Sequence, residues 1–212
     1  IFQNYKQRLH YKRWGTLFRV VGMPFNQVTA GISEVGTTKI VLQSELKNTA
    51  QSCLRGDIGA TCMNCYKCFR KILVENTVTG VDMDDAYLNR MFANRDLPKF
   101  LPKQPIWHEN VLAYVTSRYT GNHHLMNLLK KKTRGDRLET GWMERWYQPS
   151  LFLLPEKYRQ TVKDNILRYL AEMSEADRQN AESWDLTSRI SSVEYNELSE
   201  QLARELKAIN RK

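Results

Sequence analysis

The chain has 212 residues, of which 42% are hydrophobic, and this composition allows a buried core in one domain or two small ones. Its formal net charge of +9 favours anionic partners such as nucleotides, nucleic acid or an acidic protein surface. The sequence lacks a run of about eighteen apolar residues, which excludes a membrane-spanning helix. It also opens without a charged-then-apolar leader, so we expect a cytoplasmic protein without a membrane partner.

The first part of the chain is predicted to contain short helices and one strand. The β-branched, apolar run 16–23 is closed by Pro24 and is typical of a strand, such as the last one of a sheet. Ser33 is a suitable N-cap, and the acidic residues around Asp84 are best explained as a cap for the helix that follows them. Short helices are expected at residues 1–14, 33–44, 69–74 and 82–91.

Composition changes after a proline-rich segment. We therefore divide the chain into a first region, 1–97, a linker, 98–105, and a helical domain, 106–212. The clearest helix of that domain is predicted over 155–173, with Pro155 in its first turn. Ser174 with Asp177, and Ser191 with Glu194, resemble capping boxes for two later helices.

Four cysteines are the most informative feature, because all of them fall between Cys53 and Cys68. They are Cys53, Cys62, Cys65 and Cys68, spaced C-x8-C-x2-C-x2-C. Four thiolates suit the tetrahedral shell of a structural zinc ion. An iron–sulfur cluster is the main alternative. A disulfide pair fits less well, because bridges between such near neighbours are strained and the chain does not resemble a stapled secreted domain.

The cysteine region resembles the zinc loop of the 7-cyano-7-deazaguanine synthases, which belong to the PP-loop (N-type ATP pyrophosphatase) superfamily. The resemblance is carried by SC, LRGDIGAT, CMNC, YKC and FRK, and extends weakly over residues 14–90. It implies that the first region is the C-terminal remnant of a Rossmann-like α/β PP-loop fold with a four-cysteine zinc loop. Together with the helical domain predicted after it, this gives a mostly α-helical chain. It also implies ATP-dependent activation of a carboxylate on a nucleobase-like substrate.

The chain departs from this family in two places. The Ser-Gly-Gly-x-Asp-Ser loop that wraps the phosphates of ATP is absent, so the chain alone should not carry out ATP chemistry. We therefore expect a C-terminal portion of a longer protein, with ATP and magnesium bound only if the N-terminal PP-loop part is present as a partner. In addition, Met63 stands where the family has glycine, which puts the geometry of that turn in doubt.

Three cations are candidates for contact with substrate or phosphate: Lys39, Arg55 and Lys67. The densest basic run, 130–134, is explained either by a solvated helix end or by contact with phosphate. Trp142, Trp146 and Tyr147 are expected to pack in the core rather than to stack on a base. No catalytic residue is indicated. Alternative functions are a non-catalytic basic zinc module that binds nucleic acid, or a scaffold that binds a partner protein.

Overall fold

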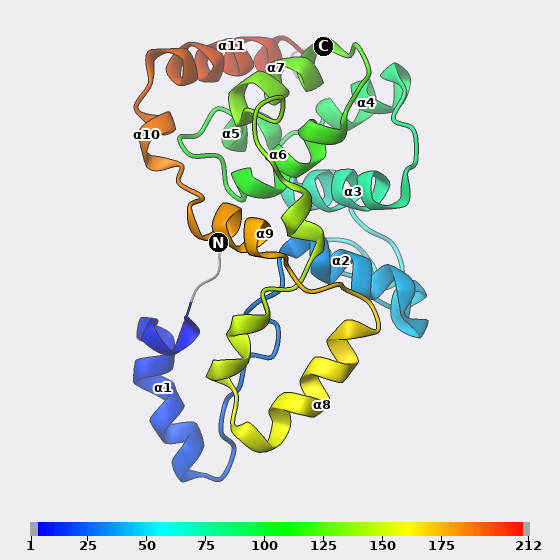
Figure 1. Cartoon of the computed structure of the whole chain (residues 1–212). Coiled ribbons are helices and arrows are strands. Elements are labelled where there is room, and N and C mark those ends of the chain that lie inside the picture. The colour runs from blue at the N-terminus through cyan, green and yellow to red at the C-terminus, as the bar shows by residue number, and fades with distance from the viewer. Residues whose placement is uncertain (1–3, 210–212) are drawn as a thin grey trace. The chain divides into compact units, whose positions relative to one another are not determined.

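The computed structural model describes residues 4–209, and within this range the chain is mostly helical and forms no strand (Figure 1). It folds into two compact units, each assembled from two separate stretches of sequence. The first unit combines the segment up to Ser44 with Gly141–Trp184, and the second combines Glu45–Thr140 with the chain from Asp185 onward. This interleaved arrangement differs from the sequential order of the predicted regions.

The first unit is built around Trp146, which is fully buried. The Trp146 backbone N–H donates to the carbonyl of Ala171, and its carbonyl accepts from the N–H of Met173, both at 2.9 Å. These bonds hold two distant stretches of chain together without a strand. The helices of this unit, with 3-10 helices marked η, are η1 (Tyr5–Gln7), α1 (Leu9–Val20), α2 (Glu34–Gln43), η3 (Gly141–Glu144), η4 (Gln148–Leu153), α8 (Glu156–Leu167) and α9 (Glu175–Glu182).

The same bonds explain why the helix predicted over 155–173 is too long. Helix α8 ends at Leu167, and the chain then turns so that the segment around Glu172 runs beside Trp146 as an isolated β-bridge. The helix is predicted from the apolar stripe Tyr158, Val162, Ile166, Leu170 and Met173. The last three of these are buried and Val162 is partly buried, but Tyr158 is exposed. The apolar pattern therefore identified most of the core residues, but it could not show where tertiary hydrogen bonds replace helical ones.

The strand predicted over residues 16–23 is wrong, because α1 covers most of that run and continues to Val20. The chain leaves the helix at Gly22, whose φ of 75° lies in the left-handed region that glycine tolerates. A short apolar run does not distinguish strand from helix by its period. Since residues 4–209 offer no strand for it to pair with, the Rossmann-like α/β remnant is not supported.

In the second unit, α6 is the central helix (Figure 1). It contacts α3 and α7, and α7 in turn contacts α11. Residues 111–116 of α6 are buried on every side, as expected for a helix that is apolar all round. The elements of this unit are η2 (Glu45–Asn48), α3 (Tyr66–Thr79), α4 (Asp85–Phe92), α5 (Leu97–Phe100), α6 (Glu109–Arg118), α7 (His124–Thr133), α10 (Thr187–Ile190) and α11 (Val193–Ile209).

The residues 98–105, predicted as a linker, include the last part of α5 and the fully buried Leu101. The buried ammonium of Lys132, from α7, donates to the carbonyls of Leu101 and Lys103 at 2.7 and 3.0 Å. These bonds fix the proline-rich segment against the helices of the second unit. The basic run 130–134 does lie at the end of α7, but Lys132 within it is only 1% exposed, so the run is not simply a solvated helix end.

Several predicted helix caps are confirmed. The Asp84 carboxylate accepts from the N–H of Tyr87 at 2.6 Å and caps α4. Ser174 and Asp177 form a reciprocal capping box at the start of α9. For α11, however, Ser192 rather than Ser191 accepts the N–H of Tyr195, so that cap lies one residue later than predicted. Caps are local, which is why the sequence predicts them well.

Candidate metal centre and adjoining pocket

The four cysteines meet at one point of the second unit. Their Sγ atoms all lie within 4.8 Å of one another. The Sγ atoms of Cys62 and Cys68 are 3.7 Å apart, and all four thiols are free. Sulfurs bonded at about 2.3 Å to the centre of a tetrahedron are roughly 3.8 Å apart along its edges. The group could therefore hold a metal ion, and its geometry does not include a disulfide.

Helix α3 fixes two of the four thiols. Cys65 is the N-cap of α3, and its Sγ accepts from the N–H of Cys68 at 3.4 Å. The two cysteines are three residues apart, so one turn places both on the same side of the helix start. The loop supplies the other pair, in which the N–H of Cys62 points at Sγ of Cys53 at 3.4 Å. Backbone N–H groups and a helix N-terminus both stabilise thiolate charge.

The thiols perturb one another's pKa values in opposite directions. N–H groups of Cys62 and Arg55 lower the pKa of Cys53 to about 6. The N–H of Asn64 lowers the pKa of Cys62, but burial and the thiols of Cys53 and Cys65 outweigh it and raise the pKa overall. Burial and the neighbouring thiols raise the pKa of Cys68. A cation in the centre would remove this conflict, because it stabilises every thiolate at once.

The loop between Cys53 and Cys62 is held by the side chain of Gln51. Its amide nitrogen donates to the carbonyls of Cys53 and Asp57 at 3.1 and 2.8 Å, and its oxygen accepts from the N–H of Gly59 at 2.7 Å. Gly56 permits the closest approach, since a Cβ there would lie 2.1 Å from the carbonyl oxygen of Ala60. A larger residue at position 56 would force the loop open.

Met63 adopts the backbone conformation that the expected glycine would suit. Its φ is 54°, in the left-handed region, where a side chain is strained. Its carbonyl accepts from the amide of Asn94 at 3.4 Å, and the same amide donates to the carbonyl of Cys65 at 3.0 Å. The unusual residue at position 63 therefore leaves the turn in the form that the cysteine array requires.

Asn94 is the buried group that attaches the metal loop to the helices. Only 4% of its surface is exposed, and its carbonyl oxygen accepts the N–H of Asp96 at 2.9 Å. Asp96 in turn receives Nη1 of Arg55 at 3.0 Å and the N–H of Tyr66 at 3.4 Å. Asn94 was not predicted from the sequence, because a lone asparagine between two short helices carries no spacing signal.

A pocket of about 370 Å³ adjoins the cysteines. Cys53 and Cys65 form part of its wall, and its volume lies in the range of about 300–1,000 Å³ that small ligands occupy. Three cations, one carboxylate and three aromatic rings contribute to the lining. These are Arg55, Lys67, Arg70, Asp96, Tyr66, Phe100 and Trp107.

The structure places the three predicted phosphate-contact residues differently. Arg55 and Lys67 both line this pocket, beside the cysteines. Lys39 lies in the first unit, where its Nζ forms an ion pair with Glu144 at 3.0 Å, and it is not part of the pocket wall. Sequence analysis did not select Arg70, which is buried in the middle of the first two turns of α3 with its guanidinium 5.9 Å from the ring centre of Tyr66.

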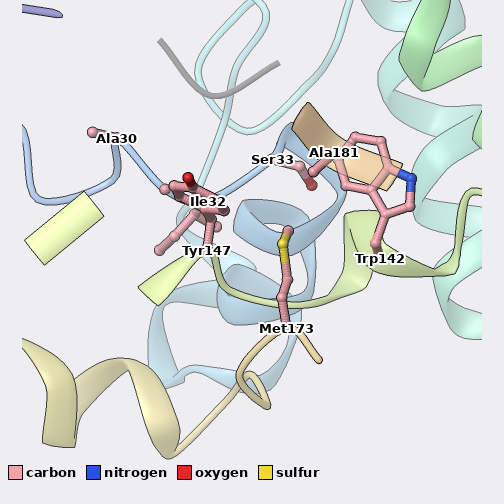
Figure 2. Close-up of a pocket in the computed structure, with 8 residues that line it drawn as sticks. Ala30, Ile32, Ser33, Trp142, Tyr147, Met173 and Ala181 are labelled. Atoms are coloured by element: carbon pink, nitrogen blue, oxygen red, sulfur yellow. The ribbon is translucent and has the colours of Figure 1, made fainter. Parts of the chain in front are cut away.

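A second cavity, in the first unit, is too small to hold a small-molecule ligand. Figure 2 shows Ser33, Trp142 and Met173 among the side chains around it. Its volume is about 30 Å³, whereas a single water needs roughly 10–15 Å³. Trp142 and Trp146 are both buried, which confirms their predicted core role. Tyr147 is only half-buried, and its hydroxyl donates to the carboxylate of Glu182 at 2.6 Å.

The fold and the site together define a mostly helical protein with a four-cysteine group able to hold a metal ion. Within residues 4–209, no helix combines the length and apolarity needed to cross a membrane. The chain belongs to a family of unknown function, DUF6395, whose model matches residues 13–185. No curated protein and no solved structure matches it.

Proposed function

We propose that the chain is a zinc-organised, non-catalytic module that binds nucleic acid. The observation that carries this proposal is the position of Arg55, Lys67 and Arg70, which line one pocket against the four-cysteine group. Zinc is the proposed metal because four thiolates suit its closed tetrahedral shell. That shell leaves no position for a reacting water, so the role of the metal is structural. The net charge of +9 adds long-range attraction for a phosphate backbone.

In this proposal the metal acts on the ligand only through the loop. Leu54 and Ile58 in the loop are exposed, so few apolar contacts hold it, and its form depends on the cysteines, Gln51 and Asn94. When bound, zinc supplies the cross-link that closes the loop. The closed loop then keeps Arg55 beside Asp96 and at the pocket, facing the same space as the cations of α3.

Binding of a fluorescein-labelled single-stranded DNA 12-mer by the zinc-loaded chain tests the proposal. The dissociation constant should rise steeply with salt. A plot of its logarithm against the logarithm of the salt concentration should have a slope of about 0.7 for each phosphate contact in a single strand. Removal of zinc by a chelator should weaken binding, and added zinc should restore it. Absent binding at low salt, or binding that does not respond to salt, would refute the proposal. If the chain instead binds a partner protein tightly and in a constant ratio, the alternative function as a scaffold is favoured.

The cysteine spacing also supports a second candidate, a C-terminal portion of a PP-loop ATPase related to the 7-cyano-7-deazaguanine synthases. In that case ATP and magnesium would be bound by an N-terminal PP-loop part of the same protein. Sequencing the gene upstream of Ile1 tests this candidate directly. A Ser-Gly-Gly-x-Asp-Ser loop after a predicted strand would support it, and a start codon near Ile1 would count against it.

A further inference from the structure

The pocket beside the cysteines contains a continuous aromatic surface. The rings of Tyr66 and Phe100 are stacked, with centroids 4.7 Å apart and planes 8° from parallel. Trp107 continues the group, with its centroid 5.5 Å from that of Phe100. Tyr66 is buried, but 60% of the Trp107 side chain is exposed. An indole that is anchored at the pocket and still open to solvent is a suitable platform for a flat ligand.

The backbone around this aromatic group is fixed. The hydroxyl of Tyr66 donates to the carbonyl of Trp107. Nζ of Lys103 lies 5.1 Å from the ring centre of Phe100 and 5.3 Å from that of Trp107. The ring positions are therefore set by α3, by the end of α5 and by the segment after α5, not by the ligand. A binding site built in this way loses little conformational entropy when it is filled.

The cations of the pocket attract an anion. Arg55, Lys67 and Arg70 line it together with one carboxylate, that of Asp96, and a zinc ion held by four thiolates would add a net charge of about minus two at the wall formed by Cys53 and Cys65. That carboxylate is already occupied, because it receives Arg55 and the N–H of Tyr66. Lys67 lies in the first turn of α3 and is exposed, so its ammonium can reach an incoming phosphate. The helix N-terminus adds partial positive charge at the same end.

We infer that this pocket holds one nucleotide unit, with the base stacked on Trp107 and the phosphate against Lys67 and Arg70. The inference rests on the proposed function and names its ligand-contact site. A nucleotide unit combines the two features that the pocket matches, a flat aromatic face and a negative charge a few ångströms away. The unit can belong to a single strand or to a free nucleotide, since both present the same base and phosphate.

The test uses the zinc-loaded full chain and three ligands: a single-stranded DNA 12-mer, an abasic 12-mer with the same backbone, and free AMP. Trp107→Ala should weaken binding of the 12-mer about 5-fold to 150-fold, the range expected when stacking on one base is lost. Trp14→Ala is the matched control, because Trp14 is also exposed but lies in α1 of the first unit. It should change binding less than twofold. Zinc content, measured in every variant, verifies that the loop is intact.

The phosphate contact is tested separately with Lys67→Ala. It should lower the salt slope for the 12-mer by about 0.7. Lys207→Ala, an exposed lysine of α11 in the same unit, is the control and should leave the slope unchanged. Quenching of tryptophan fluorescence by AMP in the unmodified chain, and its loss in Trp107→Ala, would assign the pocket to a free nucleotide.

The outcomes separate this inference from the proposed function. The stacking site is overturned if Trp107→Ala binds the 12-mer as tightly as the unmodified chain, or if the abasic and ordinary strands bind equally well. In either case, binding that still weakens with salt continues to support the proposed function. If neither strand binds but AMP binds at Trp107, the nucleotide pocket is supported and the proposed binding of nucleic acid is refuted. Failure of all three ligands overturns both.

Discussion

Replacement of Asn94 by alanine tests whether a buried amide outside the cysteine array controls metal binding. The side chain donates to the carbonyls of Cys65 and Met63 at 3.0 and 3.4 Å and accepts from the N–H of Asp96 at 2.9 Å. Alanine removes all three hydrogen bonds and leaves buried polar groups without them. The two bonds at 2.9 and 3.0 Å contribute about 1 kcal/mol each and the bond at 3.4 Å contributes little, which gives a loss of about 2 kcal/mol in the docking of the loop.

That loss should appear as weaker metal binding, because the loop carries the ligands. About 2 kcal/mol corresponds to roughly a 30-fold rise in the dissociation constant for zinc, within the 10- to 100-fold range typical of outer-shell residues. Competition with a coloured chelator at neutral pH measures the constant. Circular dichroism on the same samples reports whether the helices remain folded.

Asn64→Ala is the matched control. Asn64 is exposed and makes one 3.3 Å contact with the N–H of Arg95, so zinc affinity should change less than about twofold. Asn94→Asp should be at least as damaging as the alanine variant, because a carboxylate would face two carbonyl oxygens. If Asn94→Ala binds zinc as tightly as the unmodified chain, the loop does not depend on this amide, and our account of how the site is held is incorrect.

Three further predictions follow from the same structure. Cys65→Ser should abolish stoichiometric zinc binding, measured by elemental analysis, and expose the loop to protease; an unchanged zinc content would mean that the ligand set is incorrect. Gly56→Ala should weaken zinc binding far more than Gly59→Ala, because a Cβ at position 56 would meet backbone 2.1 Å away whereas position 59 has open space and only the strain of φ 82°; equal affinities would contradict this. Burial lowers the pKa of Lys132 to about 8, below its value in the unfolded chain. The folded chain therefore loses that proton at a lower pH than the unfolded chain. The free energy of unfolding should rise between about pH 8 and pH 10, by roughly 1 kcal/mol per pH unit. Urea unfolding should show that slope in the unmodified chain and a shallower one in Lys132→Met, and identical slopes would refute the assignment.

Sequence patterns were sufficient wherever a feature depends on neighbours in the chain. The cysteine spacing predicted a group of four thiols able to hold a metal ion, and the confirmed caps at Asp84 and Ser174 depend on bonds that span three residues. Such interactions are set by local geometry, which is the same in any fold.

Tertiary contacts decided the remaining features. Run 16–23 has the composition of a strand, yet no strand within residues 4–209 pairs with it and most of it folds as the end of helix α1. Helix α8 stops at Leu167 because the following segment bonds to the backbone of Trp146, which lies more than twenty residues earlier in the chain. Periodicity reports which residues are apolar but not which distant backbone will compete for their hydrogen bonds.

The sequence by itself determined that four sulfurs would be available close together, that the chain would carry excess positive charge, and where several helices would begin. Only the tertiary structure decided that Asn94 would hold the metal loop, that Arg55 and Lys67 would line one pocket, and that Lys39 would pair with Glu144 instead. The physical reason is range: caps and thiol spacing are fixed within one turn or loop, whereas a buried amide or a pocket wall is assembled from residues tens of positions apart. Those residues meet only after the helices have packed.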